Sequence, residues 1–418
     1  GVRDAKKNCM KIKRLLSFLL LLLTYYGGGN LAWADVSTDK YTTKDGIRYV
    51  LHLDKTATVA KFFPSQLNNP EIITIPSSVR FEGIKYTVTE FYLHSTVGDF
   101  LKNEEIEECT KVTSISIPAT LKTFTPGKFS VDVNNHSDKF KLCYEGDHTS
   151  LVKQLPNLRF FYIDSNNPYF AEYHNQLLLS KDKTTLYCCP PGQSDPTAVI
   201  FTGIKHIGPY AFVGCKLTKF IVPASLESVD DNAFSGFSAL QKFENASTTH
   251  NNKYQADEAG VLYEFASSSF NKYEDPFEVV CYPDDMQNRS EYTVYARQIA
   301  PFAFDDVTLK LLTIKDVSIR NNNGYTVISK GAFYNADFYN LTIDNQVSAI
   351  KEYAFTDATI DQPFTLGNSE FREGPATMDI GSYAFFASTI TNLTLPTRNW
   401  SEGSSSTFLI NIKDYAFY

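Results

Sequence analysis

The chain lacks the short motifs on which most enzymes and metalloproteins depend. Of its 418 residues only seven are histidine, and it contains no C-x-x-C pair and no G-x-S-x-G, H-E-x-x-H or Walker sequence. These motifs supply zinc ligands, nucleophilic serine, catalytic metal and phosphate-binding loops. We therefore predict that the protein is not an enzyme and needs no cofactor or metal.

Long apolar runs are equally scarce. The run Leu15–Leu23 is far shorter than the roughly 20 residues that span a bilayer. It follows a basic stretch after Met10 and precedes the small-x-small site Ala32-Trp33-Ala34, which is the layout of a secretory signal peptide. We predict that residues 1–34 are a signal peptide with upstream read-through, starting at Met10. The mature chain would be exported and contain no transmembrane segment.

An excess of basic charge is also absent. The formal net charge is −8, and without the six basic residues and one acidic residue of positions 1–34 it is near −13. Nucleic-acid binding depends on Lys and Arg that neutralise phosphates. The acidic balance therefore predicts no nucleic-acid partner and is better understood as a source of solubility.

Cysteine is sparse and irregularly spaced, with six residues after position 34. An exported chain can hold disulfides, but free cysteine also serves as a small buried hydrophobe. Cys215 closely follows an Ala-Phe pair, where a turn would point its side chain inward. The sequence favours a buried thiol there over a disulfide and leaves the other pairings open.

What the chain has in abundance is a repeat, in which an aliphatic residue is followed four and five places later by Ala and Phe. Its seven copies begin at Ile207, Val229, Ile299, Ile328, Ile350, Ile380 and Ile412. Successive Phe residues are 22 to 32 positions apart, except for one gap of 70. This spacing is typical of stacked repeats, so we expect the Phe side chains to form an internal ladder. A Tyr or Phe before the Ala in five copies predicts a second, partly exposed aromatic row.

Short strands with alternating apolar and polar residues lie between the copies. Phe220–Pro223 and Leu393–Pro396 are examples, and each ends at a proline. Residues 35–110 contain strand-like segments without the Ala-Phe unit and predict a β-structured N-terminal cap. Residues 111–418 predict a β-rich solenoid of short parallel strands, with turns or short helical turns on its convex side. Its longer inserts would lie at 125–155, 164–198 and 246–292.

The units Ile207–Cys215 and Leu217–Val229 resemble the leucine-rich repeat of BspA-type surface proteins, as do the segments around Asn167-Pro168-Tyr169 and Cys189-Pro190-Pro191. The resemblance covers residues 40–418. It implies a leucine-rich-repeat solenoid on an exported or surface-exposed protein, most often on the outer surface of a bacterium, and some members bind extracellular host proteins. Because the sequence stops directly after an Ala-Phe unit without a polar cap, we expect the solenoid to be truncated at its C-terminus.

The outward strand positions are the candidate binding residues. With Ile115 and Ile117 facing inward, the same register predicts an outward set made of Ser114, Ser116, Phe160, Tyr162, Lys219, Asn340, Thr342, Asn392 and Thr394. Polar residues are also what any solvated strand face carries. Phe160 and Tyr162 are of the kind enriched at interfaces, unless the nearby insert covers them.

We therefore predict a secreted or cell-surface, adhesin-like protein that binds a host or extracellular-matrix protein through an exposed sheet face. The alternative is a glycan-binding surface protein that stacks exposed Tyr and Phe on sugar rings. A third hypothesis is a hydrolase that uses the histidines and aspartates of the polar insert at 125–155, although their spacing is not that of a metal site. These residues are His136, Asp138, Asp147 and His148. The acidic pairs Asp230-Asp231, Asp284-Asp285 and Asp305-Asp306 match no calcium loop and are interpreted as turn residues.

Overall fold

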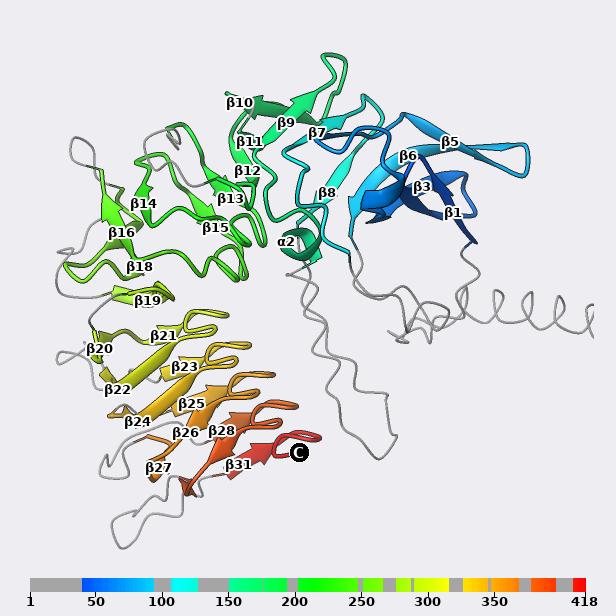
Figure 1. The fold of residues 1–418 in the computed structure, drawn as a ribbon. Helices are drawn as coiled ribbons and strands as arrows, with labels where there is room; N and C mark the ends of the chain where they lie inside the picture. The colour runs from blue at the N-terminus through cyan, green and yellow to red at the C-terminus, as the bar shows by residue number, and fades with distance from the viewer. Residues whose placement is uncertain are drawn as a thin grey trace, which may run out of the picture. The chain divides into compact units, whose positions relative to one another are not determined.

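Strands make up nearly all of the regular structure (Figure 1). A computed structural model describes residues 40–93, 107–126, 150–174, 176–193, 202–246, 251–265, 276–286, 289–315, 326–344, 347–367, 377–395 and 409–418. The predicted signal peptide and the four polar-insert residues of the hydrolase hypothesis lie outside these ranges. Within them the helical elements are η1 (Pro64–Gln66) and α2 (Ser150–Gln154), and no helix there is long and apolar enough to cross a membrane.

The N-terminal sheet is mixed. Its strands are β1 (Lys40–Lys44), β2 (Ile47–Leu51), β3 (Thr56–Phe62), β5 (Ser78–Phe81), β6 (Ile84–Tyr92) and β8 (Thr123–Thr125). They are ordered β1-β2-β3-β6-β5, and β8 pairs in parallel with the C-terminal end of β6, at Glu90–Tyr92, beyond the part that pairs with β5. The cap was predicted to end at residue 110, but β8 (Thr123–Thr125) also belongs to this sheet. Phe91 of β6 stacks on Phe124 of β8 at 4.3 Å, which carries the apolar core across that pairing.

Two hairpin modules interrupt the repeats and have the same topology. The first contains β10 (Phe170–Tyr173), β11 (Leu177–Ser180) and β12 (Thr185–Cys188), and the second contains β17 (Tyr254–Ala256), β18 (Leu262–Phe265) and β19 (Pro276–Cys281). In each, three strands pair antiparallel and the third pairs in parallel with the next coil, through β13 (His206–Ile207) or β21 (Gln298–Ile299). The likeness of the two segments in sequence is therefore a likeness in structure.

One buried asparagine fixes each hairpin module to the preceding coil. Asn251 Nδ2 donates to the carbonyls of Pro223 and Leu226 at 2.9 and 2.8 Å, and its Oδ1 accepts from two backbone N–H groups at 2.7 and 2.8 Å. Asn167 makes the equivalent four hydrogen bonds in the first module. Because both side chains satisfy backbone groups that would otherwise be buried without partners, each acts as an internal clamp.

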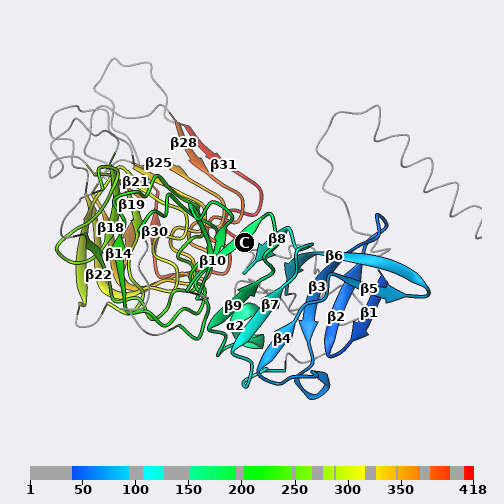
Figure 2. The same ribbon diagram turned by 90° about the horizontal axis from the view of Figure 1, so that it is seen from above.

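The repeats stack in parallel ladders on two sides of the coils (Figure 2). One ladder joins β19 and β21 to β23 (Thr326–Ile328), β25 (Val347–Ile350), β28 (Thr377–Ile380) and β31 (Leu409–Ile412). The other joins β20 (Glu291–Tyr295), β22 (Thr308–Lys315), β24 (Asp337–Ile343), β26 (Thr359–Ile360) and β29 (Thr389–Ile390). Shorter parallel sets are β13 with β15 (Ser228–Val229), β14 (Lys219–Val222) with β16 (Lys242–Asn245), and β27 (Phe364–Thr365) with β30 (Leu393–Thr394). Parallel pairing between successive coils is the pattern of a stacked repeat.

The Phe residues of the Ala-Phe units form the predicted internal ladder between the two sides. Ring centroids lie 4.9 to 5.4 Å apart in the stacked pairs Phe212–Phe234, Phe304–Phe333, Phe333–Phe355, Phe355–Phe385 and Phe385–Phe417. In the gap of 70 residues the second hairpin module contributes Tyr282, stacked 5.4 Å from Phe304. Full burial of one such ring stabilises the fold by about 1.5–3 kcal/mol.

The residue before the Ala adopts a left-handed backbone, with φ between +54° and +62°, in the six copies at Tyr210, Phe302, Gly331, Tyr353, Tyr383 and Tyr415. Tyr353, Tyr383 and Tyr415 stack in a partly exposed row at 5.5 and 5.3 Å, as predicted. For Tyr210 and Phe302 the prediction of exposure is wrong, because both are buried. Phe302 lies over Gly331, where a Cβ atom would come within 2.5 Å of its ring.

Candidate binding surface

One outward strand surface lies on β20, β22 and β24, and we call it the sheet face. Its cross-strand rows are Glu291–Leu311–Asn340, Thr293–Thr313–Thr342 and Tyr295–Lys315. Lys315 Nζ also lies 3.8 Å from Oδ2 of Asp344, the residue after β24. Between these rows the chain buries Leu312, Leu341, Ile314 and Ile343, so alternation of period two separates the core from the sheet face. The predicted outward residues Asn340 and Thr342 both lie here and are partly exposed.

A break in the alternation brings further side chains to the sheet face. The buried residues Leu309 and Leu312 are three positions apart, as are Phe338 and Leu341. Two consecutive residues of each strand therefore avoid the core, and one of them is Tyr339, which is 50% exposed. Neither Tyr339 nor Tyr295, which is 48% exposed at the end of β20, is among the residues predicted from the sequence. The three-residue spacing of apolar side chains was the signal that could have found Tyr339.

A second outward surface lies on β4 (Ile72–Thr74), β7 (Ser114–Ile117) and β9 (Phe160–Ile163), which pair in parallel. Tyr162 is 43% exposed there, while Phe160 is partly buried beside the Arg159 guanidinium, 5.6 Å from its ring. Ser116 is partly buried next to Tyr162. The prediction of an outward, exposed Ser114 is wrong, since it is 4% exposed. It occupies the central strand between Ile72 and Phe160, which flank it on both sides.

The remaining predicted residues lie on other sheets. Lys219 of β14 is half-buried, and its Nζ is 2.9 Å from Glu244 Oε2 in the neighbouring coil. Hydrogen bonds from Lys242 and Lys219 lower the pKa of the Glu244 carboxyl. Asn392 and Thr394 are exposed at β30. The nine predicted residues are thus spread over four sheets. Ser114, Ser116, Phe160 and Tyr162 share one and Asn340 and Thr342 share another, while Lys219 lies on a third and Asn392 and Thr394 lie at a fourth.

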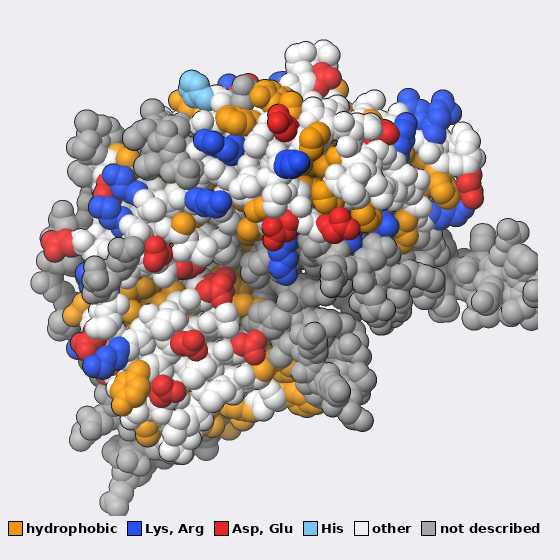
Figure 3. Space-filling model, viewed as in Figure 1, with side chains coloured by type: hydrophobic (Ala, Val, Ile, Leu, Met, Phe, Trp, Pro, Cys, Tyr) orange, Lys and Arg blue, Asp and Glu red, His pale blue; other side chains and the backbone are white. Residues whose placement is uncertain are grey.

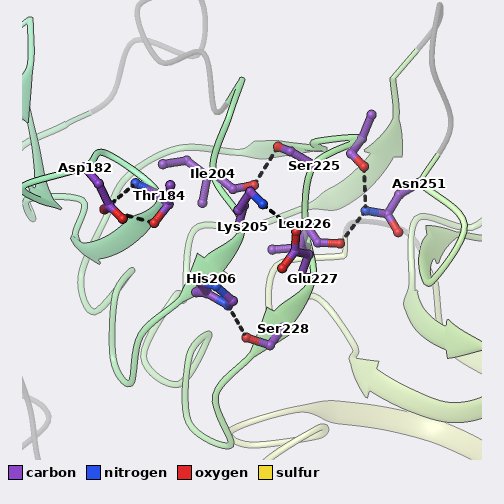
Figure 4. Close-up of polar contacts among 11 residues, drawn as sticks. Asp182, Thr184, Ile204, Lys205, His206, Ser225, Leu226, Glu227, Ser228 and Asn251 are labelled. Atoms are coloured by element: carbon purple, nitrogen blue, oxygen red, sulfur yellow. Dashed lines mark hydrogen bonds and ion pairs between the residues drawn. The ribbon is translucent and has the colours of Figure 1, made fainter.

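Polar contacts at β13 and β15 join equivalent positions of adjacent coils (Figure 4). His206 Nδ1 and Ser228 Oγ are 2.7 Å apart, and Lys205 Nζ lies 2.8 Å from Glu227 Oε1. Ser225 Oγ donates to the carbonyl of Ile204 at 2.6 Å. Exposed ion pairs of this kind contribute little to stability, because water screens both charges. Their arrangement supports the stacking of coils rather than a reacting centre.

A cavity of about 210 Å³ lies between the second hairpin module and the coils beside it. Its lining includes the carboxyl groups of Asp230, Asp231, Glu264 and Glu278, together with Gln298. Burial and then Glu264 and Asp231 raise the pKa of Glu278 to about 7, although Lys253 acts in the opposite direction. Across the described ranges no group of His, Cys, Asp and Glu has a metal-binding arrangement. The acidic cavity is accordingly a source of pH dependence.

The stability of the protein is expected to fall as pH rises from 4.5 to 7. The unfolded chain releases the Glu278 proton near the ordinary value of 4.5, whereas the folded protein holds it to about 7. Between these values the folded state binds more protons, so rising pH favours unfolding. Glu278→Gln should flatten this part of a pH series of urea denaturation midpoints, while exposed Glu258→Gln should leave it intact. An unchanged slope in Glu278→Gln would contradict the assignment.

Residues 196–258 and 326–418 match the BspA type leucine rich repeat region in six copies, which confirms the resemblance seen in the sequence. No curated protein gives a significant match.

Solved leucine-rich repeat structures are similar to the chain at low identity. A leucine rich cell surface protein from Faecalibacterium prausnitzii A2-165 is 16% identical over 89% of this chain and 97% of that chain, with a TM-score of 0.32. The pneumococcal vaccine antigen PcpA is 14% identical over 90% and 86%, with a TM-score of 0.39. A leucine-rich repeat protein from Eubacterium ventriosum is 14% identical over 88% and 98%, with a TM-score of 0.36.

Proposed function

We propose that this chain, which carries BspA-type leucine-rich repeats, is an exported, adhesin-like protein that binds an extracellular host or matrix protein through its outward strand faces. One observation carries the proposal: Tyr162, Tyr295 and Tyr339 are 43–50% exposed on strands. Most other large aromatic side chains of the described coils pack in the core. Tyr is enriched at protein interfaces because it offers large, rigid contact area with a polar end.

The surroundings of these tyrosines favour a protein partner. On the sheet face, Tyr295 and Tyr339 border rows of Thr, Asn and mixed charge, which match the polar rim of an ordinary interface. Figure 3 shows acidic and basic side chains interspersed with apolar ones on the face that it displays. A surface without one dominant sign of charge suits a folded protein partner with its own mixed surface.

The glycan alternative has weaker support. Sugar recognition by aromatics needs a free ring face, but Tyr353, Tyr383 and Tyr415 lie nearly parallel, with 7° between the planes of each stacked pair. Their neighbours in the stack therefore cover ring faces on this row and leave mainly ring edges to solvent.

Binding to immobilised fibronectin, laminin and collagens, in parallel with a glycan array, tests the proposal. We expect binding to at least one matrix protein and a loss of about tenfold in affinity for the double variant Tyr162→Ala/Tyr339→Ala, since a buried interface Tyr contributes about 1–2 kcal/mol or more. Tyr169→Ala is the matched control, because Tyr169 is also 43% exposed but lies in the turn before β10. Binding to glycans alone, or equal losses in both variants, would contradict the proposal.

A further inference from the structure

Two buried thiols from adjacent coils lie side by side. Cys189 directly follows β12, Cys215 follows the first Ala-Phe pair, and neither is more than 1% exposed. Their Sγ atoms are 2.9 Å apart. A disulfide bond is about 2.05 Å long, so the sulfur atoms need to move together by less than about 1 Å to form one.

Backbone hydrogen bonds on both sides of the pair hold the two cysteines in this position. The N–H of Cys189 donates to the carbonyl of Ala211 at 2.7 Å, and the N–H of Lys216 donates to the carbonyl of Gln193 at 2.9 Å. The adjacent Cys188 belongs to a different apolar cluster from Cys189 and Cys215, so its thiol points away from them. Only one of the two neighbouring thiols can therefore pair with Cys215 without a rearrangement of the strand.

We propose that Cys189 and Cys215 form a disulfide that joins the first hairpin module to the first Ala-Phe coil in an oxidising compartment. The oxidant is an external disulfide, either a small molecule or a protein. Two S–H bonds break, the Cys189–Cys215 bond forms, and two electrons and two protons reduce the external disulfide to two thiols. The compartment rests on the export part of the proposed function, whereas the pairing itself does not depend on binding.

Burial sets when the bond can form. Desolvation, and then the neighbouring Cys215, raise the pKa of the Cys189 thiol well above its ordinary value. Because the thiolate is the attacking species, the folded coil reacts slowly. The bond forms while the chain folds or while the coil is locally open, and once buried it resists reduction by thiols unless the protein is denatured.

Peptide mapping of the full chain tests the proposal. The protein is refolded in a mixture of oxidised and reduced glutathione, blocked with N-ethylmaleimide in denaturant and digested with trypsin without reductant. We expect peptide 184–205, with Cys188 alkylated, to be joined to peptide 206–216. The linked species should be lighter by two hydrogen atoms than the same two peptides with Cys189 and Cys215 as thiols, and reductant should separate it. Recovery of Cys189 and Cys215 both blocked, or a link that fragmentation assigns to Cys188, would overturn the proposal.

Cysteine variants separate the pairing from its alternatives. Cys188→Ser should keep the link, whereas Cys189→Ser and Cys215→Ser should abolish it. Reductant present during folding should lower the thermal midpoint of the wild type but not of Cys215→Ser. If a variant fails to fold, the wild-type map still decides. A chain that binds a matrix protein with both thiols blocked overturns the disulfide alone, and a linked chain that binds no partner overturns the binding proposal alone.

Discussion

Replacing Phe333 by alanine is expected to lower the free energy of unfolding by about 3–5 kcal/mol. The ring is fully buried, stacked on Phe304 at 5.4 Å and Phe355 at 4.9 Å, with Phe338 edge-on at 5.7 Å. Alanine leaves a cavity between two rings. The coils cannot close it, because parallel strand pairing fixes their spacing. Urea denaturation followed by circular dichroism measures the loss.

Phe417→Ala is the matched control for this prediction. Phe417 holds the same place in its unit, but it is 46% exposed and stacks on Phe385 alone, at 5.0 Å. We expect a smaller loss of about 1 kcal/mol. Because repeat proteins can open in parts, amide exchange in residues 326–344 should also accelerate in Phe333→Ala and not in Phe417→Ala. Equal losses in the free energy of unfolding for Phe333→Ala and Phe417→Ala would contradict the claim that stacking of the buried Phe ladder is the main source of stability.

Asn251→Ala is expected to destabilise the protein by about 3 kcal/mol, although no charge or large apolar group is removed. The side chain is 5% exposed and makes four backbone hydrogen bonds of 2.7 to 2.9 Å. Alanine leaves two carbonyls and two N–H groups in the interior without these partners, and each such group costs about 1–3 kcal/mol unless water reaches it. The denaturation midpoint measures the effect.

Two further variants test the Asn251 clamp: one changes the neighbouring residue, and the other replaces the Asn251 amide by a carboxylate. Asn252 is exposed, and Asn252→Ala should change the free energy of unfolding by no more than about 0.5 kcal/mol. Asn251→Asp keeps the acceptor oxygens for the N–H groups of Lys253 and Tyr254 but loses the donor to Pro223 and Leu226. We expect a loss at least as large as that of alanine, because a buried carboxylate also faces two carbonyl oxygens. A stability unchanged in Asn251→Ala would show that the clamp is dispensable.

The repeat could be predicted from sequence because each coil places the same chemistry in the same environment. An aliphatic residue, an Ala and a Phe recur wherever a coil turns, and the Phe residues stack in the core. The sequence did not reveal that Tyr282 fills the gap of 70 residues, because it comes from a hairpin module without an Ala-Phe pair. Stacking depends on where a side chain lies in the coil. Tyr282 therefore takes the place next to Phe304 in the ladder, although the sequence around it lacks the Ala-Phe pattern.

Exposure was harder to predict than periodicity. Ser114 alternates correctly with Ile115 but is buried, because neighbouring strands cover it on both sides. Phe302 holds the same turn position as Tyr383 but is buried, because the next coil has Gly331 beside it. Both errors arise from contacts between coils, which are fixed by residues about one repeat away. The sequence of a single strand or a single turn does not contain the information on these contacts between coils.

The most direct test compares the strand side of the coils with the turn side. Once a matrix protein is identified, surface plasmon resonance gives its Kd for the wild type, Tyr162→Ala/Tyr339→Ala and Tyr383→Ala. The account predicts about tenfold weaker binding for the double strand-face variant and an unchanged Kd for Tyr383→Ala, whose ring belongs to the stacked turn-side row. An unchanged Kd for the double variant, together with weaker binding in Tyr383→Ala, would contradict it and move the binding surface to the turns.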